Sequence, residues 1–230
     1  MDQYYIDCLI ENLRKSNRGC YIGHRFVGCI IYADDIVLLC PSVIGLQDMV
    51  NICSEFSREY DILFNETKSL CMQFGNDEIV ADIVLNNKPL NWCEKVKHVG
   101  NMINSALTDE DDILIKKQDF FHQVNKLIVD YKGLRYNVIK ELFRKYCTSF
   151  YGCQCWDLRS KCINDFYIAF NKGARRVLDL PYSTHRYQLP IILGMDTTEV
   201  ILCKRFLKLS MTMFLSKNSM VSFLFQFFSE

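Results

Sequence analysis

Two short apolar runs rich in β-branched residues flank a pair of aspartates and constrain the fold more than any other feature of the sequence. The runs cover residues 27–32 and 36–39, with Asp34 and Asp35 between them. Such runs on either side of a polar pair predict a β-hairpin, although Asn-Gly or Asp-Gly is the commoner turn. The chain is therefore expected to contain an antiparallel sheet with both carboxylates at its turn.

Helical and strand-like periodicities surround this hairpin. Residues 4–15 carry apolar positions at helical spacing, and Ser42 is placed to cap a helix whose apolar face continues to Tyr60. After a turn at Asp61, strand-like segments follow at residues 69–74 and 96–103, and a second hairpin at 79–85 and 88–92 turns at Asn86-Asn87. Residues 20–103 are thus expected to form an α+β block.

The second half of the chain has a helical pattern. Acidic residues 109–112 fit a first helical turn, where the helix dipole favours negative charge. Helices are predicted at about 113–131, 135–150 and 160–179, with Pro181 ending the last, and one or two more after Thr197. The expected fold class is α+β, with domains at residues 1–105 and 106–230.

Charge limits the expected modes of nucleic-acid binding. Lys plus Arg and Asp plus Glu both total 27, which gives a net charge of zero. Autonomous nucleic-acid binders often carry a basic excess, so any such contact must rest on local basic faces.

The cysteines and the apolar runs bear on the compartment. The 12 cysteines show no pair of CxxC type with matching ligands, so free and mostly buried thiols in a reducing compartment are expected rather than a zinc site. The acidic N-terminus does not fit a signal peptide, and no apolar run reaches the length of a membrane span. The expected location is cytoplasmic or nuclear.

The aspartate pair suggests metal chemistry. Two adjacent ionised carboxylates repel each other unless a cation neutralises them, and Mg²⁺ prefers carboxylate oxygens while leaving positions open for phosphates. The simpler alternative is a polar turn. The apolar strands that run up to Asp34 and Asp35, with Tyr32-Ala33 before them, favour the metal interpretation.

With this motif the chain resembles reverse transcriptases of LINE-like non-LTR retrotransposons. The segment GCYIGHRFVGCIIYADDIVLLCPS (19–42) is similar to their active-site hairpin, and LNWCEKVKHVGNMI (90–103) to their primer grip. Residues 42–75, with Phe-Asn and Lys-Ser, resemble the helix and motif that follow the hairpin, and residues 170–194 resemble a helical region farther downstream. The resemblance implies a partial polymerase palm followed by a helical thumb-like region.

The resemblance also assigns roles to individual residues. It implies RNA-directed DNA polymerisation by two-metal nucleotidyl transfer, with Asp34 as a ligand of Mg²⁺ or Mn²⁺ and Asp35 as a supporting carboxylate. Tyr32 would line the site near the nucleotide or primer, and Lys68 could donate a proton to pyrophosphate or be an ordinary solvated lysine. His98 and Gly100 belong to the primer-binding turn, where His98 fits a turn residue better than a catalyst.

Nucleic-acid partners are expected at the helical half. In the family, an RNA template and a DNA primer are held there through phosphates, while interleaved acids in this chain favour an ordinary solvated face. The candidate backbone contacts are Lys116, Lys117, Lys126, Arg135, Arg144 and Lys145.

One element of the family's metal site is not evident. The family carries a further aspartate on a strand well upstream, and only Asp2 and Asp7 precede the hairpin here. We therefore expect a truncated transposable-element enzyme that is inactive alone and whose partner is the N-terminal part of the domain. The alternatives are a non-catalytic remnant that binds nucleic acid or protein, and a fragment with no function of its own.

Overall fold

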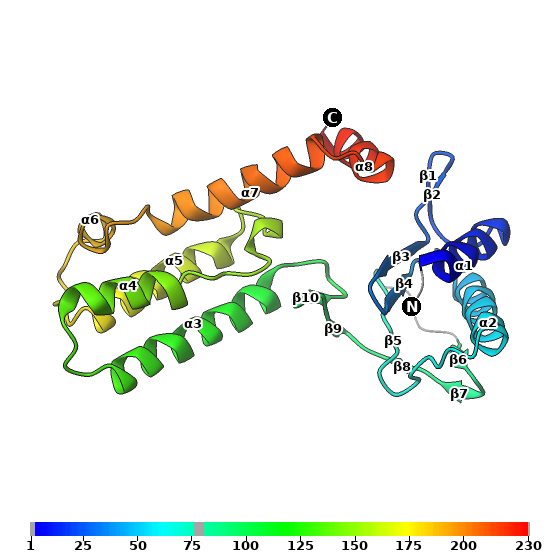
Figure 1. The fold of residues 1–230 in the computed structure, drawn as a ribbon, viewed down its shortest axis with the longest axis horizontal. Helices are drawn as coiled ribbons and strands as arrows, with labels where there is room; N and C mark the ends of the chain where they lie inside the picture. The colour runs from blue at the N-terminus through cyan, green and yellow to red at the C-terminus, as the bar shows by residue number, and fades with distance from the viewer. Residues whose placement is uncertain (1–2, 76–80, 230) are drawn as a thin grey trace. The chain divides into compact units, whose positions relative to one another are not determined.

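The structure is a computed structural model that describes residues 3–75 and 81–229 (Figure 1). Its content is mixed, with 51% of the residues in helices and 13% in strands, in agreement with the predicted α and β content. The chain divides into two compact units, Met1–Val96 and Lys97–Glu230. The predicted boundary after residue 105 lies farther along, between the strand β10 (Asn101–Asn104) and the helix α3 (Glu110–Asp130).

The first unit contains two helices and several short strands. The predicted helix at 4–15, the predicted hairpin around Asp34 and the helix after Ser42 are all confirmed. The elements are α1 (Gln3–Lys15), β1 (Tyr21–Ile22), β2 (Arg25–Phe26), β3 (Cys29–Tyr32), β4 (Asp35–Leu38), α2 (Val43–Glu59), β5 (Leu70–Cys71), β6 (Val84–Leu85), β7 (Lys88–Pro89) and β8 (Asn91–Trp92).

Helices α1 and α2 bury one face of the β3–β4 hairpin. Leu9 and Leu13 of α1 pack with Met49 and Phe56 of α2, and all four side chains are buried. Helix α2 begins where the sequence predicts, because the Ser42 hydroxyl accepts a hydrogen bond from the Gly45 backbone N–H at 3.1 Å. Helices α1 and α2 therefore pack against one face of the hairpin and stabilise it.

The strands are shorter and paired differently than predicted. Within residues 3–75 and 81–229 they form five two-stranded sheets rather than one continuous sheet. Strand β5 is only two residues long and pairs parallel with β8. Residues 88–92, predicted as one strand, form two strands, because β7 pairs with β6 and β8 pairs with β5. The predicted hairpin at Asn86-Asn87 is confirmed as β6–β7, although residues 79–80 of its first predicted strand lie outside the described residues.

The single strand predicted at residues 96–103 is wrong. The segment is a hairpin of β9 (Lys95–His98) and β10, which turns at Val99-Gly100. Val99 has a φ of 46° and Gly100 a φ of 79°, and the positive φ of both central residues is the pattern of a tight hairpin turn. A valine in this conformation is unusual, so the residue pattern indicates a strand here. The turn that the resemblance implies at His98 and Gly100 is present.

The second unit is helical after β10. The predicted helices are confirmed, but α4 ends before residue 150, and the sequence does not indicate η1 or α6. The elements are α3, α4 (Tyr136–Tyr146), the 3₁₀ turn η1 (Cys153–Cys155), α5 (Lys161–Val177), α6 (Gln188–Leu193), α7 (Thr198–Phe214) and α8 (Ser219–Ser229).

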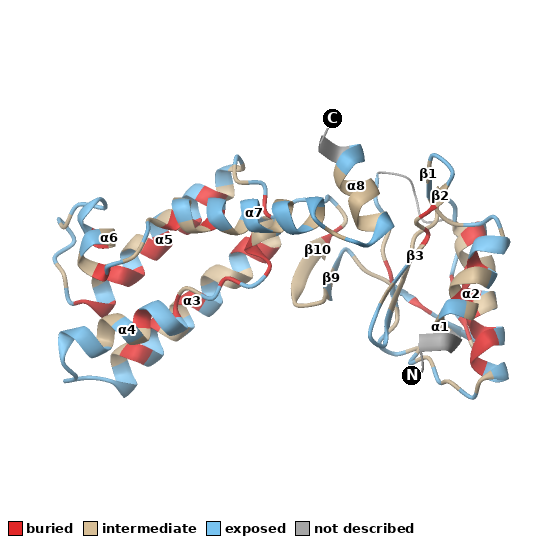
Figure 2. Ribbon diagram, turned by 45° about the horizontal axis from the view of Figure 1, so that its top comes forward, coloured by how far each residue is buried: buried red, intermediate tan, exposed pale blue. Residues whose placement is uncertain are grey.

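An aromatic cluster forms the core of this unit. Phe120 of α3 stacks on Phe170 of α5 with ring centroids 5.3 Å apart, and Phe143 of α4 contacts both rings. Figure 2 shows buried residues along α3 and α5.

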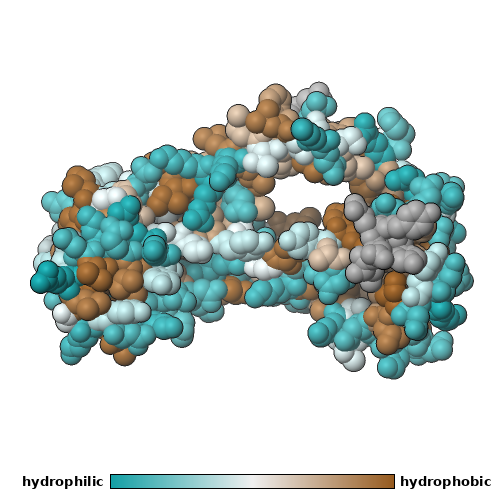
Figure 3. All heavy atoms as spheres, in the orientation of Figure 1, coloured by the Kyte–Doolittle hydropathy of each residue, from teal (hydrophilic) through white to brown (hydrophobic). Residues whose placement is uncertain are grey.

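Hydrophobic residues also reach the surface in patches separated by hydrophilic ones (Figure 3). On α7 and its C-terminal end the exposed apolar side chains include Leu207, Met211, Phe214 and Leu215.

Candidate metal-binding hairpin

The register of the β3–β4 hairpin places one aspartate in the turn and the other on a strand. Tyr32 pairs with Asp35, so the turn consists of Ala33 and Asp34, and Asp35 is the first residue of β4. The expectation that Asp34-Asp35 forms the turn is therefore wrong by one residue. One carboxylate lies on the turn, and the other lies on a paired strand beside Tyr32.

The turn is backbone-strained at Ala33. Its φ is 55°, whereas Asp34 is not among the residues with positive φ. A positive φ at the first central residue only is the pattern of a type II′ turn, in which glycine is the usual residue. Ala33 keeps a Cβ in a region that L-residues rarely adopt, so the surrounding hairpin must hold it there.

The two faces of the hairpin have different surroundings. Cys29, Ile36 and Leu38 pack against the core formed by α1 and α2. Strand alternation places Ile30 and Tyr32 on the opposite face, where they are 52% and 64% exposed. Because Asp35 is paired with Tyr32, these two side chains lie on the same face and next to each other.

The carboxylates are exposed and uncompensated. Both Asp34 and Asp35 are exposed, and within the described part of the chain neither side chain has an ion pair or hydrogen bond. No third strand pairs with β3 or β4 among the described residues. The hairpin therefore presents two free carboxylates and two open strand edges.

The donor set fits part of a magnesium site. Across residues 3–75 and 81–229, no group of three His, Cys, Asp or Glu side chains could hold a metal ion. Mg²⁺ is nevertheless often held by one or two carboxylates together with substrate phosphates and water. Asp34 and Asp35 would supply the two carboxylates of such a site, and substrate phosphates and water would supply the other ligands.

Lys68 lies in a tight turn of the same unit. The Asn65 side-chain oxygen accepts hydrogen bonds from the backbone N–H groups of Thr67 and Lys68, both at 3.1 Å. The Lys68 side chain is exposed, and no hydrogen bond or ion pair between it and Asp34 or Asp35 occurs in the described part of the chain. The structure thus fixes the backbone of Lys68 and leaves its ammonium in solvent.

The turn that contains His98 and Gly100 belongs to the second unit and is held by a buried ion pair. Lys116 donates a hydrogen bond to the Gly100 carbonyl at 2.8 Å and lies 3.6 Å from Asp112. Asp112 is 4% exposed and accepts hydrogen bonds from the Met102 backbone N–H and from the Trp156 indole N–H. His98 ends β9 and is half-buried.

This network is not expected from the sequence. The sequence places Asp112 among several helix-dipole acids, yet its main partner, Trp156, lies 44 residues away. Lys116 is a predicted phosphate contact, and the structure places its ammonium inside the unit instead, with the side chain 13% exposed. The i,i+4 spacing of Asp112 and Lys116 allows an ion pair on one helix face, but it does not indicate that the pair is buried.

The other basic candidates lie on the surface of the helical unit. Lys126, Arg135 and Lys145 are exposed, and Lys117 is half-buried. Arg144 pairs with Glu141 at 3.0 Å. Arg144 and Lys145 both line a groove of about 840 Å³, whose other lining residues are Glu141, Thr148, Pro190, Ile191, Gly194, Met195, Asp196 and Ile201. The structure therefore brings two of the six candidates together.

Comparison with known proteins gives no assignment. No protein-family model, no curated protein and no solved structure matches the chain. In the described residues, no helix is both long and apolar enough to cross a membrane. All twelve cysteines are free, as predicted, but only four of them are fully buried.

Proposed function

We propose that this chain carries the catalytic hairpin of an RNA-directed DNA polymerase of the non-LTR retrotransposon type. The observation that carries the proposal is the free carboxylate pair at a strained hairpin tip, with Asp34 on the turn and Asp35 beside Tyr32. A non-glycine residue with a positive φ persists only where the surrounding structure holds it, and strained backbone conformations of this kind are concentrated at functional sites. A purely structural turn would be expected to use glycine at position 33.

The residues of the hairpin have separate tasks in this proposal. Asp34 and Asp35 would hold Mg²⁺ or Mn²⁺, which supplies activation of a primer hydroxyl and stabilisation of the leaving pyrophosphate. Tyr32 presents an exposed ring on the same face as Asp35, where it would limit the position of a nucleotide or primer end. The core below Cys29, Ile36 and Leu38 keeps both strands fixed.

The second unit would hold the nucleic acid. The turn at Gly100 is fixed by the buried Lys116–Asp112 pair, so it presents a rigid edge to a primer. Lys117, Lys126, Arg135, Arg144 and Lys145 would contact phosphates of an RNA template or a DNA primer. Because enzymes of this type act at nuclear DNA, the proposed location is cytoplasmic or nuclear.

A complete polymerase centre needs a further carboxylate. No third acidic side chain joins the pair among the described residues. We therefore propose that the chain does not polymerise alone and that a partner segment, the N-terminal part of a palm, supplies the missing ligand. Pairing of that segment with an open edge of β3 or β4 would also satisfy the unpaired strand groups.

The test combines metal binding with primer extension. In ¹H–¹⁵N spectra, low concentrations of Mn²⁺ should broaden the signals of residues 32–36 first, because the carboxylate pair attracts the ion. Asp34→Asn should abolish this selective broadening. Asp119→Asn serves as a matched control, because Asp119 is an exposed aspartate on α3 and is not part of the pair.

Primer extension on an RNA template with Mg²⁺ completes the test. We expect no extension by the chain alone. Extension by the chain that is unaffected by Asp34→Asn would contradict the proposed role of the hairpin, as would Mn²⁺ broadening that is equal in wild type and in Asp34→Asn.

A further inference from the structure

The connection between α5 and α6 carries exposed aromatic side chains that the proposed polymerase chemistry does not use. Tyr182 is 87% exposed and Tyr187 is 62% exposed. The remainder of residues 181–188 is also exposed apart from Thr184, which is half-buried. Large rings in solvent on a connecting segment are unusual for core packing, so they indicate a binding surface.

Each of these tyrosines is accompanied by an arginine. The Arg186 guanidinium lies 4.8 Å from the centroid of the Tyr187 ring and donates a hydrogen bond to its hydroxyl at 2.8 Å. Arg175 lies 5.8 Å from the Tyr182 centroid and is anchored by a hydrogen bond from its Nε to the Thr184 carbonyl at 2.9 Å. Positive charge thus sits beside both exposed rings.

Planar side chains lie close together around Tyr187. The rings of His185 and Tyr187 have centroids 4.9 Å apart and are tilted by 33°. With Arg186 they form an exposed cluster of planar groups, and the hydrogen bond to the Tyr187 hydroxyl raises the pKa of Arg186. Nucleic-acid bases stack on aromatic rings and on guanidinium planes, so another planar group can join such a cluster.

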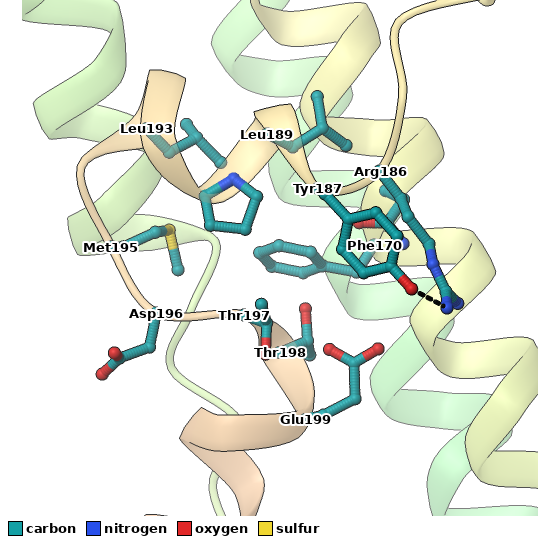
Figure 4. A pocket seen from close by; sticks show the side chains of 12 residues that line it. Phe170, Arg186, Tyr187, Leu189, Leu193, Met195, Asp196, Thr197, Thr198 and Glu199 are labelled. Atoms are coloured by element: carbon teal, nitrogen blue, oxygen red, sulfur yellow. Dashed lines mark hydrogen bonds between the residues drawn. The ribbon is translucent and has the colours of Figure 1, made fainter.

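A small cavity lies beside Arg186 and Tyr187 (Figure 4). Its volume is about 120 Å³, below the roughly 300–1,000 Å³ usual for drug-sized ligands. Phe170, Leu189 and Leu193 give it an apolar floor, and Glu199 provides a hydrogen-bond acceptor at the rim. The cavity can therefore receive one planar group with N–H donors, rather than a long chain.

A groove lined by two basic and two acidic side chains continues from the cavity. The groove lined by Arg144 and Lys145 shares Pro190, Met195 and Asp196 with the cavity. The negative charges at this position are partly compensated, because Lys204 pairs with Asp196 at 2.6 Å and Arg144 with Glu141. A phosphate backbone would therefore follow Arg144 and Lys145 and avoid the rim at Glu199.

We propose that the exposed cluster of His185, Arg186 and Tyr187, together with Tyr182, binds unpaired bases of a single-stranded nucleic acid whose backbone follows the Arg144–Lys145 groove. Stacking needs splayed-out bases, so a duplex of the same length should bind more weakly. Because every base has a π-face, the surface should be tolerant of sequence. This site lies entirely in the second unit and needs no metal ion.

The experiment measures fluorescence anisotropy with a labelled single-stranded oligonucleotide of about 12 nucleotides, within the usual size of such sites. EDTA is present, so that the result is independent of metal binding at Asp34 and Asp35. We expect Tyr187→Ala to weaken binding about tenfold, Tyr182→Ala to weaken it less, and Tyr187→Phe to retain it. Tyr146→Ala is the matched control, because Tyr146 is an exposed tyrosine on α4 outside this surface.

A salt titration tests the groove separately. Replacing Arg144 and Lys145 by Gln should reduce the dependence of log K on log salt by about 0.7 for each phosphate that these side chains neutralise in the wild type. The proposal is overturned if the single strand does not bind, if Tyr187→Ala binds as well as wild type, or if a duplex or a poly-glutamate peptide competes equally. Circular dichroism of Tyr187→Ala shows that a loss of binding is not a loss of folding, because the side chain is mostly exposed.

Discussion

At the scale of single residues, Ala33 connects the stability of the first unit to its candidate site. A non-glycine residue at a φ of 55° is destabilised by about 1–2 kcal/mol relative to its preferred conformation. The hairpin maintains this conformation through four paired positions and through the apolar face that α1 and α2 cover. The site geometry is therefore maintained against a local backbone preference.

Replacing Ala33 tests this strain. Ala33→Gly should raise the free energy of unfolding of the first unit by about 0.5–1 kcal/mol, because relief of the strain exceeds the entropy loss of glycine. Ala33→Val should lower it by about 1–2 kcal/mol, because a β-branched residue fits a positive φ poorly. Urea unfolding followed by Trp92 fluorescence in a Trp156→Phe background gives the measurement, since the chain has two tryptophans.

Equal stabilities of the three proteins would contradict the strain at position 33. A lower stability of Ala33→Gly than of wild type would show that the entropy of glycine outweighs any strain. Ala81→Gly is a suitable control, because Ala81 is exposed, belongs to the first unit and is absent from the residues with positive φ.

At the scale of elements, periodicity and capping residues predict the helices well. Apolar spacing predicts α1, α2, α3 and α5, and Ser42 caps α2 as expected because its hydroxyl satisfies a free N–H group. These features depend on neighbours within a few positions, so the sequence contains them directly.

Other elements depend on distant contacts and escape prediction. Helix α6 is six residues long and contains Pro190, so its sequence has the features of a loop. The turn at Val99-Gly100 is held by Lys116, and Asp112 is fixed by Trp156. For the candidate site, the sequence indicates the hairpin and both aspartates. It does not indicate that Asp35 lies on the strand, because residue types alone do not fix the pairing register. The register matters because a shift of one residue moves every side chain to the other face.

Packing between α3 and α5 leads to a second stability prediction. A Cβ at Gly173 of α5 would lie 2.5 Å from the Phe120 ring. Glycine to alanine in a helix normally stabilises it by up to about 1 kcal/mol. Here Gly173→Ala should instead lower the free energy of unfolding of the second unit by about 1–3 kcal/mol, because the core becomes overpacked. Urea unfolding followed by Trp156 fluorescence in a Trp92→Phe background checks this.

A double mutant identifies the cause of the destabilisation. Phe120→Leu removes the ring that Gly173→Ala would contact, so the second substitution should be much less destabilising in that background. Additive effects of the two substitutions would contradict close packing of these residues.

At the scale of the whole molecule, each hydrophobic core contains at least one buried thiol, and the core of the second unit contains both Cys147 and Cys153. Cys53 lies in the core between α1 and α2, Cys71 in the core around Ile83, and Cys147 in the aromatic core of the second unit. Burial raises the pKa of Cys53 and of Cys147 to about 12 and that of Cys71 to about 11. These thiols are therefore both shielded and protonated in the folded protein at neutral pH.

Alkylation under native conditions should follow this distribution. At about pH 8, iodoacetamide should label the exposed Cys203 quickly and the three buried thiols only after their core opens, because the thiolate is the reactive form. Since the cores belong to two units, Cys53 and Cys147 should become labelled at different urea concentrations. Mass spectrometry of the labelled peptides gives the measurement, and rapid native labelling of Cys147 would contradict the packing of its core.

The raised thiol pKa values also fix the direction of a pH effect on stability. The thiols keep their proton in the folded protein and lose it in the unfolded chain above the usual pKa of 9.0. Their contribution to stability is therefore complete below about pH 9 and is lost as the pH rises toward the pKa in the folded protein, which is about 12 for Cys53 and Cys147 and about 11 for Cys71. The loss is on the order of 1.4 kcal/mol per pH unit for each thiol. Urea midpoints measured between about pH 8 and pH 10.5 should fall accordingly in wild type, and Cys147→Ala should reduce the slope for the second unit alone. If the slope of the first unit fell equally in that variant, the two units would not open independently, and the assignment of Cys147 to the core of the second unit would lose its basis.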